Sequence, residues 1–84
     1  MNTKEMISCI PEAHRHTIEV YSDLIAQRKI RNDAVGAIEY RKKLDGYLTC
    51  MKDAGIVTEY GRRALGLWYG SERVRVQIRE GAVG

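Results

Sequence analysis

The chain has 84 residues, enough for one small domain, and a domain of this size buries only about 60–65% of the surface that its unfolded chain exposes. Its apolar fraction of 44% and charged fraction of 30% are ordinary for a soluble globular protein. No apolar stretch reaches the length of about 20 residues that spans a bilayer, and residues 1–11 lack a signal-peptide pattern, so we expect a cytoplasmic protein.

The net charge of +3 is unevenly distributed. Residues 1–27 contain two basic and four acidic residues, a net charge of −2, whereas the remainder contains twelve basic and seven acidic residues, a net charge of +5. Such a gradient favours either contact with nucleic acid or docking of complementary subunits, and does not distinguish the two. Because so small a core needs reinforcement, we expect a homodimer or a higher oligomer.

Residues 1–10 predict an N-terminal arm. Asn2 or Thr3 can cap a short turn in it, and Pro11 ends that turn because the residue before a proline avoids helical geometry. From residue 11 to about residue 29, side chains recur at spacings of three and four, which predicts a helix with one packing face. The members of this face are Ile10, His14, Thr17, Ile18, Tyr21, Leu24, Ile25 and Arg28.

A second helix is predicted over residues 34–53. Asn and Asp are good N-cap residues, so the break is expected at residues 31–33, although one continuous long helix is the alternative. The end of this helix is the clearest local signal in the chain. Gly55 can adopt the left-handed conformation, and Ile56 can fold back on Met51 or Leu48, as in a Schellman ending.

Thr58 is expected to cap a third, shorter helix over residues 59–69. After it the period changes, because residues 72–79 alternate between apolar and polar side chains. This alternation predicts a strand with Val74, Val76 and Ile78 on one face. A lone strand cannot satisfy its own backbone groups, so we expect it to pair with a second copy or with a partner's sheet edge. The alternative is a frayed tail that ends at Gly84.

No residue set in the chain predicts a chemistry. Cys9 and Cys50 lack the spacing of a metal or redox pair and are expected to be buried free thiols. His14 and His16 stand two residues apart and would point to different sides of a helix, so no metal site is expected. Since no nucleophile-base motif or phosphate-binding loop is present, we expect a protein that is not an enzyme and holds no cofactor.

An aromatic and basic cluster leads into the predicted strand. Trp, Tyr and Arg are enriched at the hot spots of protein interfaces, and a domain this small leaves some apolar surface for a second chain. The predicted partner-binding residues are Leu65, Trp68, Tyr69, Arg73 and Arg75.

Nucleic-acid binding is the alternative function. Clustered basic residues can neutralise phosphates, and the two helices around Gly55 have the order of a helix-turn-helix. The residues that would contact DNA or RNA are Arg41, Lys42, Lys43, Arg62 and Arg63.

The run from Tyr47 to Glu59, in which Asp53-Ala54-Gly55-Ile56 precedes Thr58-Glu59, resembles the helix, glycine stop and Thr-Glu restart of small helical proteins of temperate bacteriophages and prophages. Within that set, the chain is similar in size and expected helical content to small phage antirepressors. The resemblance implies a protein that binds a phage repressor and removes it from its operator. It assigns no site residues.

The expected fold class is therefore mainly α, with an antiparallel helical hairpin, a third short helix and a short C-terminal β-strand, in an oligomer. Residues 1–84 are expected to form one domain, with an arm over 1–10, a helical core over 11–69 and a basic strand or tail over 71–80. The expected function is that of a non-enzymatic regulator, an antirepressor or inhibitor that inactivates a repressor or a host factor. A purely structural assembly protein is a third possibility.

Overall fold

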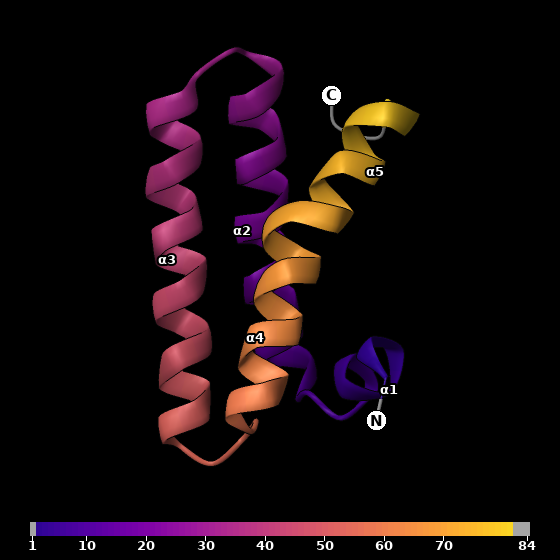
Figure 1. Cartoon of the computed structure of the whole chain (residues 1–84), viewed down its shortest axis with the longest axis vertical. Coiled ribbons are helices and arrows are strands. Elements are labelled where there is room, and N and C mark those ends of the chain that lie inside the picture. Colours follow the sequence, from indigo (N-terminus) through magenta and orange to yellow (C-terminus); the bar gives the residue numbers. More distant parts are fainter. Residues whose placement is uncertain (1, 82–84) are drawn as a thin grey trace.

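The computed structural model describes residues 2–81, which are mainly helical (Figure 1). The elements are α1 (Thr3–Ser8), α2 (Glu12–Ile30), α3 (Ala34–Asp53), α4 (Glu59–Leu67), a π-helical segment η1 (Trp68–Glu72) and α5 (Arg73–Glu80). The last three follow one another without a break, as one bent helical run (Figure 1). Within the described residues, no helix is both long enough and apolar enough to cross a membrane.

Short-range capping sets where the helices begin. The side chains of Asn2, Asp33 and Thr58 each accept a hydrogen bond from the backbone N–H three residues later, at 2.8, 2.8 and 3.0 Å. These bonds satisfy N–H groups that have no partner within the helix. The predicted caps of α1 and α4 and the predicted break at residues 31–33 are therefore confirmed.

The helices α2 and α3 end with the same backbone geometry. At the end of α3, Gly55 has a φ of 78°, and the Ile56 N–H donates to the Met51 carbonyl at 2.9 Å. At the end of α2, Asn32 takes the left-handed position with a φ of 59°, and the Asp33 N–H donates to the Arg28 carbonyl at 2.8 Å. Both are Schellman endings, so the prediction for Gly55 is confirmed.

The helices α2 and α3 form the predicted antiparallel hairpin (Figure 1). The inner side of the hairpin, the helical run that covers it, and α1 with the residue before Pro11 contribute to one apolar core. Burying this surface is the main driving force for folding. The buried core residues are Met6, Ile10, Ile18, Ile25, Ala26, Leu44, Leu48, Met51, Leu65, Tyr69 and Val74.

A polar and aromatic seam joins α2 and α3. On α2 its members are His14, Tyr21 and Arg28, seven residues apart, a spacing that returns to the same side of a helix after two turns. His14 Nδ1 and the Tyr47 hydroxyl lie within hydrogen-bond distance, at 2.6 Å, and the rings of Tyr21 and Tyr47 meet edge to face. Arg28 forms an ion pair with Asp33 at the hairpin turn. His14 thus has a structural role.

The prediction of a C-terminal strand is wrong. No strand occurs in residues 2–81, and residues 73–80 form α5, which packs against α2 (Figure 1). A helix satisfies its backbone hydrogen bonds within the segment, whereas a strand here has no partner in the same chain. The third helix and the residues after it therefore cover the hairpin of their own chain. Residues 82–84 of the predicted tail lie outside the described residues.

A five-residue step in the apolar pattern accounts for the π-helical segment. The buried side chains of the run are Leu65, Tyr69 and Val74, at spacings of four and five. An uninterrupted α-helix that buries Leu65 and Tyr69 would turn Val74 away from the core, because 3.6 residues complete a turn. The wider turn over Trp68–Glu72 takes up the extra residue and leaves Val74 fully buried.

Candidate interaction surface on α4

Two of the predicted partner-binding residues lie in the core. Leu65 is fully buried and Tyr69 is 2% exposed, so neither side chain offers surface to a partner in this structure. Burial raises the pKa of the Tyr69 phenol above its usual value. The sequence alone does not show which side of this helical run the core covers.

The other three predicted residues have different surroundings. Trp68 is half-buried and lines a pocket with Thr3, Lys4 and Ile7 of α1. Arg73 is held by Asp23 of α2, to which its Nη1 donates at 2.9 Å. Arg75 is exposed and forms no ion pair with any described residue. Their use in partner binding stays a prediction.

The outward face of α4 carries the exposed apolar side chains of this helix. Tyr60 is 69% exposed and Leu67 is 59% exposed, and they stand seven residues apart, on one side of the helix. Between them, the Arg63 side chain is 73% exposed. We call Tyr60, Arg63 and Leu67 the α4 face. Most exposed helical positions carry polar residues, so two large apolar groups around an arginine mark this face as unusual.

An arginine-lined pocket of about 390 Å³ borders the α4 face on the side of α3. Its lining residues are Arg41, Asp45, Arg62, Arg63, Gly66 and Leu67. Arg41 donates from Nε to Asp45 Oδ1 at 3.2 Å and from Nη1 to Ser71 Oγ at 3.1 Å, so it bridges α3 and η1. A Cβ atom at Gly70 would overlap Arg41 Nη1, so only glycine leaves the guanidinium in this position.

Glu59 binds Arg62 and Arg63, the other two arginines that line this pocket, which we call the arginine pocket. Its carboxylate accepts two hydrogen bonds from Arg62, one of them at 2.9 Å from Nε, and one from Arg63 Nε at 3.1 Å. These bonds, those of Arg62 first, lower the pKa of the Glu59 carboxyl to about 2. The same contact raises the pKa of Arg62. One carboxylate thus serves two guanidinium groups and leaves excess positive charge beside the pocket.

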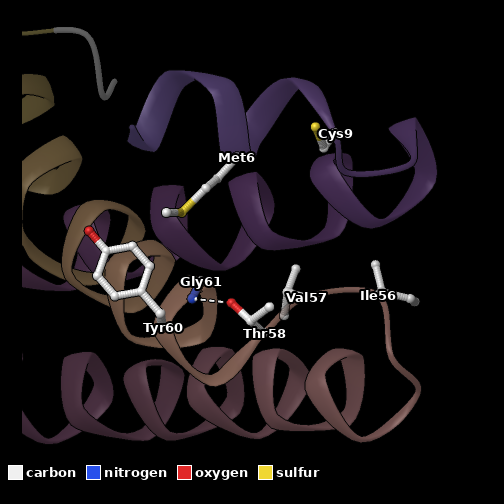
Figure 2. Close-up of a pocket in the computed structure, with 7 residues that line it drawn as sticks. All are labelled: Met6, Cys9, Ile56, Val57, Thr58, Tyr60 and Gly61. Atoms are coloured by element: carbon white, nitrogen blue, oxygen red, sulfur yellow. Dashed lines mark hydrogen bonds between the residues drawn. The ribbon is translucent and has the colours of Figure 1, made fainter. Parts of the chain in front are cut away.

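A second pocket, of about 360 Å³, lies between α1 and the turn into α4 (Figure 2). It is mostly apolar, and the Thr58 hydroxyl in its wall is already used by the Gly61 N–H. Cys9 stands at its edge, and both Cys9 and Cys50 are exposed, so the prediction of buried thiols is wrong. The spacing of the two cysteines in the sequence does not indicate whether their side chains face the core or the solvent.

Metal ligands do not gather in the part of the chain that the structure describes. No three His, Cys, Asp or Glu side chains there stand close enough to hold an ion together.

The basic residues of the alternative, nucleic-acid reading are largely engaged within the chain. Arg41, Arg62 and Arg63 form ion pairs with Asp45 or Glu59. Lys43 lies over the ring of Tyr40, with its Nζ 5.2 Å from the ring centroid. Lys42 is exposed. Phosphates would have to compete with these carboxylates for three of the five cations.

The α4 face had a signal in the sequence. The apolar residues of 60–69 occupy more than one side of a helix: Tyr60 and Leu67 stand seven residues apart, and Leu65 and Tyr69 occupy the opposite side. A single core can cover only one of these sides, so one apolar group had to face outward. Comparisons of the chain with protein-family models, with curated proteins and with solved structures find no match.

Proposed function

We propose that this chain is a non-enzymatic regulator that binds a protein partner through the α4 face. The observation that carries the proposal is the exposure of Tyr60 and Leu67 on one side of α4, with Arg63 between them. Tyrosine and arginine are enriched at interface hot spots because they combine a large contact area with directed hydrogen bonds. Burying the two apolar side chains against a partner would remove them from water.

The proposed class of target is a repressor or another regulatory factor, which the bound chain would inactivate. This part of the proposal rests on the resemblance of residues 47–59 to small phage proteins of the antirepressor type. It includes action in the cytoplasm, where such a factor is met, and self-association into a dimer or a higher oligomer. The exposed apolar side chains also give a second copy a surface to cover, so the test includes the oligomeric state.

The experiment is a tagged pull-down from a lysate of the organism that encodes the chain, run with and without nuclease and at two salt concentrations. The variants Tyr60→Ala and Leu67→Ala are compared with Val35→Ala, which removes an exposed apolar side chain at the start of α3, beside the turn from α2. We expect one stoichiometric protein that survives nuclease and higher salt, is lost with either α4 variant and is kept with Val35→Ala.

Other outcomes would reject parts of this proposal. If nuclease abolishes the capture, the result would indicate that the chain binds nucleic acid. Equal loss with all three variants would show that the α4 face is not the site. Light scattering of the purified chain at several concentrations measures self-association separately, and a dimer that dissociates with Leu67→Ala but captures no other protein would favour a structural assembly role.

A further inference from the structure

We infer that the arginine pocket receives a carboxylate from an acidic segment of the protein partner, whose apolar side chains cover Tyr60 and Leu67. This inference rests on the proposed function and adds the chemistry of the partner. The pocket opens directly beside the α4 face, since Arg63 and Leu67 belong to both. One bound segment can therefore contact the apolar side chains and the guanidinium groups together.

The guanidinium of Arg41 is held in place from two sides. Asp45 accepts from its Nε and Ser71 accepts from its Nη1, so its orientation is set before a ligand arrives. Its Nη2 lies 3.9 Å from where a Cβ of Gly66 would be, at the wall of the pocket, and donates to no described residue. An oriented donor with unused N–H groups binds an anion at a lower entropic cost than a free surface arginine does.

Arg62 and Arg63 also retain donors. Arg62 donates to Glu59 from Nε and Nη2, and its Nη1 makes no hydrogen bond within the described residues. Arg63 uses only its Nε for Glu59, so both of its Nη groups make no hydrogen bond within the described residues. Around the pocket, the three arginines face the two carboxylates of Asp45 and Glu59, which leaves one positive charge in excess. Planar forks of N–H groups match the two oxygens of a carboxylate.

The neighbouring groups favour a protein segment over a nucleic acid. Asp45 and Glu59 lie among the arginines, so the one positive charge in excess matches a single carboxylate but not the successive phosphates of a nucleic-acid strand. The adjoining surface is apolar at Leu67, which suits a leucine-like side chain one helical turn from the carboxylate. An acidic amphipathic helix presents both groups with that spacing.

The test uses a capped helical peptide that carries glutamate and leucine on one face, and a matched peptide in which glutamine replaces every glutamate. The arginine side-chain Nε–Hε signals of the intact 15N-labelled chain are followed by NMR during each titration. We expect the glutamate peptide to shift the signals of Arg41, Arg62 and Arg63 in a saturable way, and the glutamine peptide to bind at least about fivefold more weakly.

Variants locate the site. We expect Arg41→Gln, Arg62→Gln and Arg63→Gln each to weaken the glutamate peptide by about two- to fivefold, the range for exposed charge pairs. Arg79→Gln removes an exposed arginine of α5 outside the pocket and is expected to leave the affinity unchanged. Circular dichroism of each variant checks that it remains helical. If one variant unfolds, the shifts of the arginine Nε–Hε signals in the unmodified chain still test the inference.

Three results would overturn the inference: equal binding of the glutamine peptide, an equal loss with Arg79→Gln, or tighter binding of a single-stranded oligonucleotide with a steep salt dependence. The outcome for the proposed function is distinguishable. If Leu67→Ala abolishes capture of a protein partner but the three arginine variants do not weaken it, the α4 face is the site and the pocket has no part in it.

Discussion

Arg73, the first residue of α5, donates a hydrogen bond to Asp23 in the middle of α2, across 2.9 Å and 50 residues of sequence. The Gln77 Nε2 donates to the same Asp23 oxygen at 2.7 Å, and Arg73 also donates to the Gln77 side-chain oxygen. One carboxylate thus holds two positions of α5 on the hairpin. These hydrogen bonds connect α5 to α2 of its own chain.

We expect Asp23→Ala to lower the free energy of unfolding by about 1–2 kcal/mol, because it leaves two partly buried donors without their acceptor. Arg73→Ala should cost about 1 kcal/mol, and the double variant less than the sum, since the two residues share the interaction. Urea unfolding measures these values. Arg75→Ala, two residues along the same helix and exposed, is the control and should change little. A neutral Asp23→Ala would show that the ion pair does not hold α5.

The π-helical register predicts unequal roles for the valines of α5. Val74 is fully buried, and Val74→Ala should cost about 2 kcal/mol because it leaves a cavity in the core. Val76 is only partly buried, so Val76→Ala should cost less than about 1 kcal/mol. Chemical denaturation of the two variants tests this. In a strand both side chains would lie on one face, and equal costs would argue for that arrangement.

Gly70 and Arg41 should be energetically coupled. A methyl group at Gly70 would displace the Arg41 guanidinium and its hydrogen bond to Ser71, which offsets the gain of up to about 1 kcal/mol from better helix propensity. In an Arg41→Ala background, Gly70→Ala should show only the stabilisation from better helix propensity. A double-mutant cycle should therefore give a coupling energy of about 1 kcal/mol between the two positions. Gly46→Ala, where nothing lies within 4 Å of the new methyl, should stabilise in either background.

A buried hydroxyl offers a simple gain in stability. Ser22 on α2 is fully buried, and its Oγ has no hydrogen-bond partner among the described residues. Ser22→Ala should therefore raise the free energy of unfolding by about 1 kcal/mol, because it removes an unsatisfied polar group and favours the helix. Thermal unfolding should show a higher midpoint. A clear loss of stability would mean that the hydroxyl has a partner that this structure does not contain.

The Glu59 carboxyl should titrate far below its usual range. Its pKa of about 2 lies below the ordinary 4.5, so the ionised form contributes stability that is fully present above about pH 4.5 and is lost as the pH falls towards 2. Carboxyl 13C NMR measures this midpoint directly. Arg62→Gln should raise the pKa of Glu59 more than Arg63→Gln does, since Arg62 is its stronger partner. Equal midpoints in all three chains would contradict the arrangement.

The sequence by itself determined where α1, α3 and α4 begin and where α3 ends. Asn2, Asp33 and Thr58 cap helices, and Gly55 ends one, through bonds that span five residues or fewer. Such contacts form wherever the local residues allow them, so they can be read without the rest of the chain. The antiparallel hairpin follows from two long amphipathic helices joined by a short turn.

Only the tertiary structure decided the conformation of residues 73–80 and the position of the candidate site. The alternation of Val74, Val76 and Ile78 favours a strand locally. The hydrogen bond to Asp23 and the burial of Val74 instead stabilise a helix with an enlarged turn. The covered side of α4 depends on where α1 and the hairpin lie, because apolar residues surround much of that helix. Packing therefore buried Leu65 and Tyr69 and left Tyr60 and Leu67 exposed.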